Sequence, residues 1–497
     1  MPTEPKTQNN FETITNLAAD EVTEGSLSFS FRRYLTRVIG LDRAISFTIG
    51  ARIWSSLAGI ATLFAISRFL TPAEQGLYYT FSSLIALQVV FELGFSFVIL
   101  QLASHEAAHV VRTGAGFEPG SSAHARLASI LKKTISYYSV MAIAMGVILL
   151  PAGIFFFRTN GLSHGKGWLT PWCFVALVAS ASLPTAPLVS FFEGCGEISQ
   201  AAELRLIQAV TGSLLAWSAF VVHAGLFAPG MIIAGQVICA AIWLMRRRTV
   251  MASLLRSDSN EHTVNWRSEI WPFQWRIAIS WVSGYLIFQL FNPVLFAFQG
   301  PVVAGQMGMS LAIATALANI GLAWINTKAS PFGTLVARRQ YKELDRLFND
   351  ALRQSLAMLT IGCVFTWICA QIAAAYSPGI GHRLLPATPF GLLLATTVLN
   401  HIVFSQAIYL RAHKKESFLS ISVLSAVVVG VSTYLTGKTF GATGAMVSYF
   451  FGHGVLCVLL GNIIFARDRK RWHADTRNDQ TFKRDRSRQN WQPEGPV

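Results

Sequence analysis

Apolar runs of about 20 residues, separated by short polar segments, recur along most of the chain, and each could cross the hydrocarbon core of a membrane as a helix. The pattern therefore predicts an all-α polytopic membrane protein with about twelve transmembrane helices. The predicted spans lie near residues 46–67, 76–101, 134–157, 171–192, 204–223, 227–245, 277–298, 302–326, 355–376, 385–409, 418–436 and 441–466.

The positive charges are distributed unevenly between the two sides of these spans. Almost all of the 40 Lys and Arg residues fall in every second connecting segment, starting with the N-terminal one. The segments on the other side hold only Arg68, Arg158, Lys166, Arg383 and Lys438. Because Lys and Arg are enriched in cytoplasmic segments, this asymmetry predicts that both termini are cytoplasmic.

Two similar turns indicate that the chain is internally duplicated. The segment from Phe69 to Gly76 and the segment from Phe298 to Gly305 each place a Pro four residues before a Gly, between two spans. Pro ends or starts a helix and Gly opens the next one, so each pair predicts a tight helical hairpin. We predict two lobes of about six helices each, arranged as the parallel repeat of a transporter with a site between the lobes.

The domain boundaries follow from the same pattern. The predicted parts are a disordered cytoplasmic tail at 1–43, an N-lobe at 44–247, a cytoplasmic linker at 248–275, a C-lobe at 276–466 and a basic cytoplasmic tail at 467–497. Before the span at 355–376, apolar residues from Leu344 to Leu352 recur at helical spacing opposite basic ones. This spacing predicts an amphipathic helix on the inner membrane surface.

Composition supports the membrane assignment and narrows the chemistry. Of the 497 residues, 52% are hydrophobic and 13% are charged, whereas a soluble domain carries about 25% charged residues. The net charge of +15 does not indicate nucleic-acid binding, because the basic residues lie in short segments between apolar runs. The six cysteines lie in or beside apolar runs and are interpreted as packing residues. No metal-ligand spacing, phosphate loop or nucleophile motif occurs, so we predict no metal, cofactor or catalytic residue.

Three short stretches carry a resemblance to a known family. The first runs from Ser67 to Tyr78 through the first Pro–Gly hairpin, the second is Phe91-Glu92-Leu93-Gly94-Phe95, and the third is Phe192-Glu193-Gly194. These stretches resemble the polysaccharide flippases, including O-antigen flippases, of the multidrug/oligosaccharidyl-lipid/polysaccharide (MOP) exporter superfamily. The resemblance is clear over residues 46–105, looser over the rest of the chain and absent from both tails.

The resemblance implies a function that composition and spacing do not. Members of this family move lipid-linked oligosaccharides across the bacterial inner membrane by alternating access, in the biosynthesis of surface polysaccharides. It implies a polyprenyl-diphosphate-linked glycan as the cargo, contacts with membrane lipids and with glycan polymerisation or export machinery, a monomer, and no enzymatic activity.

Arginines at the inner ends of two spans are the first candidates for cargo binding. Arg52 lies on a face of the first span with Ser55 and Gly59, and its planar fork of donors suits a diphosphate. The alternative is that Arg52 extends to the inner interface, only about 7 Å away at the helical rise. Arg276, which opens the seventh span, is either a second cavity cation or an ordinary inner-side anchor.

Other polar residues inside spans have both functional and structural interpretations. Glu92 is either an ion-coupling carboxylate, or the partner of a cavity arginine, or a structural group near the inner end of its helix. Asn319 and Asn326 either line a path for sugars or hold helices together. His401 and His453 are interpreted as hydrogen-bonded packing residues, with proton relay as the less favoured alternative.

Competing functions remain open at this point. A drug exporter of the same superfamily typically carries an acidic residue in its first span, where this chain has Arg52. A membrane glycosyltransferase or polymerase usually places catalytic residues in a large outer loop, and the outer segments here are short. A peptidoglycan-precursor flippase usually has fourteen spans. The three inner glutamates Glu193, Glu197 and Glu203 are predicted to form an inner-turn network with Arg205 and not a catalytic pair.

Overall fold

The computed structural model of the protein describes residues 43–113, 116–118, 121–162, 167–256, 271–413, 415 and 417–489. Residues 1–42 of the predicted tail at 1–43, residues 257–270 of the predicted linker and the last residues at 490–497 lie outside the described residues, and Arg43 is the first residue of the first described helix. The first half comprises α3 (Arg43–Phe69), α4 (Pro72–Ile85), α5 (Gln88–Glu92), α6 (Phe95–Ala107), β1 (Arg112–Thr113), β2 (Gly116–Phe117), α7 (Ser122–Phe157), η1 (Arg158–Leu162), α8 (Leu169–Ser182), α9 (Thr185–Gly194), α10 (Ile198–Val221), η2 (Gly225–Phe227), α11 (Ala228–Met245) and α12 (Arg248–Arg256).

The second half is also helical. It comprises α13 (Trp271–Phe288), α14 (Phe291–Gln299), α15 (Pro301–Asn326), α16 (Ala329–Ala337), α17 (Tyr341–Tyr376), α18 (Pro378–Gly381), α19 (Ala387–Ala412), α20 (Leu419–Tyr449), η4 (Phe450–Val455) and α21 (Leu456–Gln489). The two strands form a two-residue antiparallel pair, so the all-α class predicted from the sequence is confirmed for the described chain.

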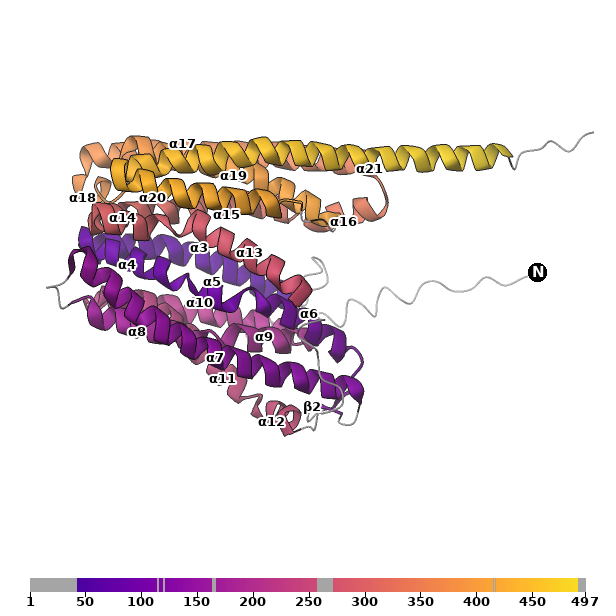
Figure 1. The fold of residues 1–497 in the computed structure, drawn as a ribbon, viewed down its shortest axis with the longest axis horizontal. Helices are drawn as coiled ribbons and strands as arrows, with labels where there is room; N and C mark the ends of the chain where they lie inside the picture. Colours follow the sequence, from indigo (N-terminus) through magenta and orange to yellow (C-terminus); the bar gives the residue numbers. More distant parts are fainter. Residues whose placement is uncertain are drawn as a thin grey trace, which may run out of the picture.

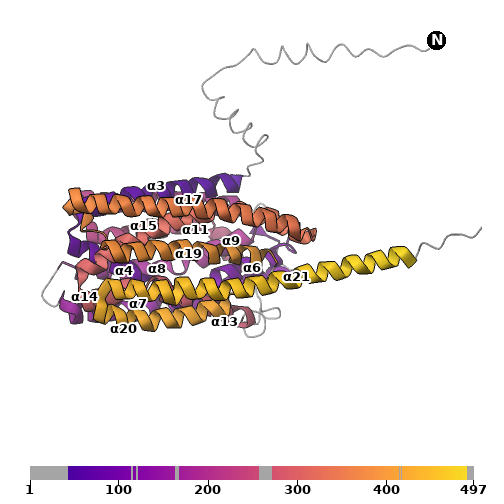
Figure 2. The same cartoon turned by 90° about the horizontal axis from the view of Figure 1, so that it is seen from above.

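The long helices run side by side in two groups, α3–α11 in one lobe and α13–α21 in the other (Figures 1 and 2). The first residue of α3 and the last of α21 lie at the same end of the bundle, as expected for an even number of crossings (Figure 2). Following the predicted orientation, we name this the inner end. The opposite end, with the α3–α4 and α14–α15 turns, is the outer end.

The number of spans agrees with the predicted twelve. Ten helices in the described chain are long and apolar enough to cross a membrane, and α4–α6, bent by 42°, makes an eleventh. One of the ten, Leu419–Trp472, contains a non-helical residue, Gly441, at φ 61° and ψ −145°. Its two arms are antiparallel, because Ser425 Oγ lies 2.6 Å from His453 Nδ1 across them. Counting these arms separately gives twelve spans.

The two predicted Pro–Gly hairpins are present and begin differently. At the first, Thr71 caps α4: its hydroxyl accepts from the Glu74 N–H at 3.3 Å, and Glu74 Oε2 accepts from the Thr71 N–H at 2.8 Å. This capping box satisfies N–H groups that would otherwise lack partners. At the second, α15 follows Gly300, which has φ 87° and no side chain to cap the helix. Glycine tolerates that conformation.

The two hairpins pack against each other and form the outer seam, which we define as the contact of α4 with the N-terminal half of α15. A Cβ added at Gly76 would overlap the carbonyl oxygen of Pro301, and one added at Gly305 would lie 2.8 Å from the Gly76 nitrogen. A Cβ at Gly308 would likewise overlap the Tyr79 side chain. The backbones of the two lobes therefore approach as closely as glycine permits.

The second span is broken where the sequence shows the Glu92-Leu93-Gly94 element. Leu93 has φ 51° and Gly94 has φ 70°, which ends α5 and starts α6. Gln274 of α13 donates its side-chain N–H to the Leu93 carbonyl. A Cβ at Gly94 would lie 2.5 Å from Ile277 of the same helix. The element therefore shapes a contact between α13 and the N-lobe.

Three segments differ from the predicted outline. The amphipathic stretch that begins at Tyr341 is not a separate surface helix but the start of α17, and Leu344 and Phe348 pack with Tyr409 and Phe465. The tertiary packing of this apolar stripe explains the difference. The linker begins with helix α12, and the basic segment after residue 466 is helical as far as Gln489 (Figure 1).

We expect Gly76→Ala to lower the unfolding free energy by about 1–3 kcal/mol, because the added methyl must displace backbone and not a flexible side chain. Thermal unfolding in detergent measures the effect. Gly59→Ala is the matched control: it is also in a helix, and nothing lies within 4 Å of its added Cβ. Equal stability of Gly76→Ala and Gly59→Ala would contradict the close approach of the seam.

Candidate functional site

The outer halves of α3 and α15 are in contact, because Ile66 of α3 shares a hydrophobic cluster with Met309 of α15. Closer to the inner end, Arg52, Ser55 and Gly59 continue the Ile66 face of α3 and are exposed. On α15, Thr315, Asn319 and Asn326 continue the face of Gly308, which meets Tyr79 of α4, and they are exposed as well. We name the inner region that these two exposed faces border the inner cleft.

The structure brings three of the predicted site residues to the inner cleft. Arg52, Asn319 and Asn326 are exposed, and their side chains have no hydrogen-bond or ion-pair partner among the described residues. A cation and two amides on facing helices can offer donors to an anion and donors and acceptors to hydroxyl groups. Amides that held helices together would be paired instead.

Arg276 does not join this group. Gln274, Ile277 and Trp281 form the face of α13 that contacts Leu93 and Gly94. Arg276 lies on the opposite face of α13 by helical spacing, with its guanidinium carbon 5.4 Å from the centroid of the neighbouring Trp275 ring. Arg276 is therefore not one of the residues that border the inner cleft.

A second polar site lies within the N-lobe. A cavity of about 210 Å³ opens between helices of this lobe. It is lined by Gln88, Glu92, Ser182, Leu183, Thr185, Ala186, Val189, Ser190, Arg205, Gln208 and Gln236. We name it the N-lobe pocket. Amide, hydroxyl and charged groups converge in it from α5, α8, α9, α10 and α11, which fits a small polar ligand or an ion with its water.

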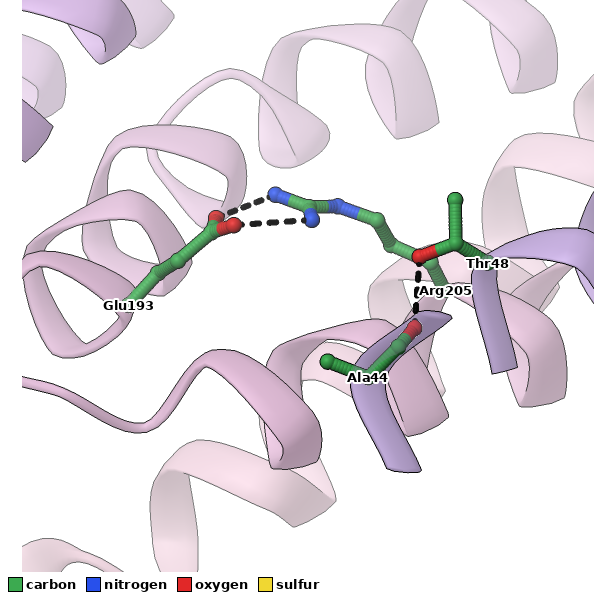
Figure 3. Close-up of polar contacts among 4 residues, drawn as sticks. All are labelled: Ala44, Thr48, Glu193 and Arg205. Atoms are coloured by element: carbon green, nitrogen blue, oxygen red, sulfur yellow. Dashed lines mark hydrogen bonds and ion pairs between the residues drawn. The ribbon is translucent and has the colours of Figure 1, made fainter. Parts of the chain in front are cut away.

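Glu92 and Arg205 line this pocket without forming a pair with each other. Glu92 Oε1 accepts from the Ser96 hydroxyl at 2.8 Å, and no cation among the described residues lies within ion-pair distance of it. Both terminal guanidinium nitrogens of Arg205 instead donate to the Glu193 carboxylate, one of them at 3.1 Å. The start of α3 lies beside this pair, where the Thr48 hydroxyl donates to the Ala44 carbonyl (Figure 3). Glu92 is therefore an unpaired carboxylate in a polar pocket.

The sequence did not indicate the pocket, because its residues come from separate helices without a local motif. Gln208 and Gln236 lie in the predicted spans at 204–223 and 227–245, and they were not singled out. Amides inside apolar runs are the signal that could have found this pocket. Their convergence on one cavity depends on the rotation of each helix, which hydropathy does not specify.

The three inner glutamates each form an ion pair, as predicted, but only Glu193 pairs with Arg205. Glu203 pairs with Arg43 at 2.9 Å and Glu197 with Arg247 at 2.6 Å. The three pairs join α9 to α10, α10 to α3, and the residue before α10 to the segment after α11. Each carboxylate has its own arginine, so these glutamates stabilise the inner end of the N-lobe and are not arranged as a catalytic pair.

The intramembrane histidines hydrogen-bond to neighbouring serines, as predicted for packing residues. His401 Nε2 lies 2.8 Å from Ser355 Oγ, and His453 Nδ1 lies 2.6 Å from Ser425 Oγ. Both rings are buried in the C-lobe. Within the described part of the chain, no group of three or more His, Cys, Asp or Glu side chains could hold a metal ion.

No family model matches the sequence, and no curated protein matches it either. The structure, however, is similar to solved transporters. It superposes on an inward-facing multidrug resistance MATE family transporter of the MOP superfamily with a TM-score of 0.62 and 15% identity, over 87% of this chain and 98% of that one. For an outward-facing MATE family transporter the TM-score is 0.52 at 14% identity, over 91% and 99% of the chains.

A MOP superfamily transporter from Pyrococcus furiosus Vc1 is also similar, with a TM-score of 0.52 and 14% identity over 91% of this chain and all 100% of that chain. Identities this low show the fold alone. The chain is thus a multi-pass membrane protein with the fold of MOP superfamily transporters.

We expect loss of Arg247 to destabilise the N-lobe more than loss of Arg205. The Arg247 and Glu197 side chains are each 14% exposed, whereas the Arg205 side chain is 50% exposed. Breaking a buried pair costs about 3 kcal/mol or more, and an exposed pair contributes about 1 kcal/mol or less. Thermal unfolding in detergent should therefore rank Arg247→Met well below Arg205→Met, and the reverse ranking would contradict this assignment of burial.

Proposed function

We propose that this protein flips a lipid-linked oligosaccharide precursor across the bacterial inner membrane by alternating access. The observation that carries the proposal is the inner cleft, which is bordered by the exposed Arg52 of α3 and the exposed amides of Asn319 and Asn326 of α15, none of them paired within the described residues. An arginine fork can hold a diphosphate through two parallel hydrogen bonds. The amides suit sugar hydroxyl groups, because each can both donate and accept.

The surface of α3 beside Arg52 supports a cargo with a lipid tail. A row of large apolar residues follows this helix at helical spacing, and all are strongly exposed: Ile45, Ile49, Ile53, Leu57, Ile60 and Phe64. This row adjoins the polar face that lines the inner cleft. A cargo could therefore place its charged head in the cleft while its polyprenyl chain stays against the apolar row in the bilayer.

The proposed cycle starts from the inward-open arrangement. The diphosphate binds at Arg52 with the sugars toward α15, and closure of the inner cleft then accompanies opening of the outer seam. Both termini are proposed to be cytoplasmic, so the cargo is loaded where cytoplasmic enzymes assemble it. The proposed partners are the lipid-linked glycan, membrane lipids and the machinery that polymerises or exports the glycan, with the protein acting as a monomer.

The N-lobe pocket favours a second candidate, ion-coupled export of a small molecule. Its volume of about 210 Å³ and its free carboxylate, Glu92, suit an ion or a small polar solute better than an oligosaccharide. Two of the similar solved structures are described as multidrug resistance transporters. In a flippase the same carboxylate would serve as the coupling group, so the pocket is compatible with both candidates.

Flipping is tested in liposomes that contain the purified protein and a fluorescent polyprenyl-diphosphate oligosaccharide, with leaflet location read by chemical quenching. We expect Arg52→Ala to slow flipping about ten- to a hundredfold, because hydrogen bonds to a charged group are lost. Arg52→Lys keeps the charge but not the fork and should retain intermediate activity.

Arg276→Ala is the matched control, since Arg276 is also an exposed arginine near the inner end of a span, and it should flip cargo at the wild-type rate. Normal flipping by Arg52→Ala would sink the proposed diphosphate site. No flipping by the wild-type protein, together with uptake of small cations into the same liposomes, would favour the second candidate.

We expect Glu92→Gln to remove the stimulation of transport by an imposed pH or sodium gradient while leaving cargo binding intact. The amide has nearly the shape of the carboxylate but can neither be charged nor release a proton. Initial transport rates with and without the gradient measure the effect. Glu193→Gln is the control, because Glu193 is already paired with Arg205. Unchanged stimulation in Glu92→Gln would exclude Glu92 as the coupling group.

A further inference from the structure

The segment between α18 and α19 lies over the outer seam and is attached to the C-lobe. Gln306 of α15 donates its side-chain N–H to the His382 carbonyl at 2.9 Å, and the Leu385 N–H donates to the Ser310 hydroxyl at 3.0 Å. Both contacts lie within the C-lobe. The segment therefore moves with α15 in any rigid-body motion of the lobes.

Arg383, in the same segment, reaches across to the N-lobe. Its Nη1 donates to the Gln75 side-chain oxygen at 3.1 Å and to the Ile66 carbonyl at 3.5 Å. Ile66 is near the outer end of α3, and Gln75 is in the first turn of α4. One side chain of the C-lobe thus contacts two helices of the N-lobe.

Gln75 of the N-lobe also donates hydrogen bonds to the C-lobe. Its amide nitrogen donates to the Gly305 carbonyl at 2.8 Å and to the Arg383 carbonyl at 3.0 Å. Gln75 is only 1% exposed, so its amide group is fully used by C-lobe partners at a site without access to water. Gln75 and Arg383 therefore exchange hydrogen bonds in both directions across the seam.

The charge of Arg383 is held by neutral acceptors. No carboxylate of the described residues lies within ion-pair distance of its guanidinium, and partial burial lowers the pKa of Arg383. A desolvated cation without a carboxylate is bound less firmly than an ion pair would be. This arrangement closes the seam with directional contacts, yet the contacts can be exchanged for water when the seam opens.

We infer that Gln75 and Arg383 form a latch that keeps the outer seam closed in the inward-open state, and that outward opening requires this latch to break. The four hydrogen bonds that Gln75 and Arg383 make across the seam join groups that separate when α4 and α3 move away from α15. At the inner end, the residues of α3 and α15 that border the inner cleft are exposed. The latch therefore biases the lobes toward the inward-open arrangement, whichever cargo the protein carries.

The test is a distance measurement by electron paramagnetic resonance on the full chain, without cargo. Spin labels at Val222 and Phe440, both strongly exposed near the outer ends of α10 and α20, report opening of the outer end. Labels at Ala108 and Ala337, also exposed, report closure of the inner end. The six native cysteines, none of which forms a disulfide, are first replaced.

Gln75→Leu and Arg383→Met each remove the latch while keeping approximate side-chain volume. We expect each to raise the ratio of long to short outer distances about tenfold, since each loses hydrogen bonds of a charged group. The double variant should shift less than the two single effects combined, because the two side chains share the hydrogen bond between Arg383 and Gln75.

The matched control is Gln306→Leu, which loses a side-chain hydrogen bond to the same segment without crossing the seam. It should keep the wild-type distances. If Gln75→Leu does not fold, Arg383→Met still decides the question, because Arg383 lies in a connecting segment and is only partly buried. Wild-type outer distances in folded Arg383→Met, or an equal shift in Gln306→Leu, would overturn the latch.

Discussion

The close approach of α4 and α15 at Gly76 and Gly305 is the contact on which the rest of the structure depends. A methyl group at either glycine would meet backbone of the other lobe, so the outer ends of the lobes are joined at the smallest possible separation. The second span bends by 42° beyond this contact, at Leu93 and Gly94, where α13 packs against it. The lobes are therefore joined by the outer seam and by α13, whereas the residues that border the inner cleft are exposed.

The polar side chains differ in their pairing between the inner end, the inner cleft and the outer seam. Paired charges, such as Glu197 with Arg247, lie at the inner end of the N-lobe and hold its helices together. Unpaired polar groups lie where a cargo could reach them, as Arg52 and Asn319 do in the inner cleft. The hydrogen bonds of Gln75 and Arg383 across the seam involve no carboxylate, and they are the contacts that can be exchanged for water. Ion pairs therefore hold helices together within the N-lobe, whereas hydrogen bonds that water can replace join the two lobes.

The Glu92-Leu93-Gly94 element could be singled out from the sequence, but its backbone conformation and its neighbours could not. The sequence singled out Glu92 as a coupling carboxylate, a partner of a cavity arginine or a structural group near the inner end of its helix, and left these alternatives open. In the structure, the left-handed backbone at Leu93 and Gly94 breaks the second span, and α13 packs directly onto Gly94. Glu92 is thereby directed to the N-lobe pocket, a cavity that no local pattern revealed. The Glu92-Leu93-Gly94 element, which the sequence suggested as a functional motif, therefore also allows α13 to pack against the second span.

The sequence by itself determined the spans, their even number, the two Pro–Gly hairpins and the asymmetry of positive charge, because hydropathy and helix-breaking residues act locally. It also identified Arg52, Asn319 and Asn326 as polar positions inside apolar helices. Only the tertiary structure decided which of these meet. The rotation and tilt of each helix place Arg276 away from the N-lobe contact, and bring Gln75 to Arg383, which is 308 residues away in the chain. Such pairings depend on packing between distant segments, and no periodicity within a single segment encodes them.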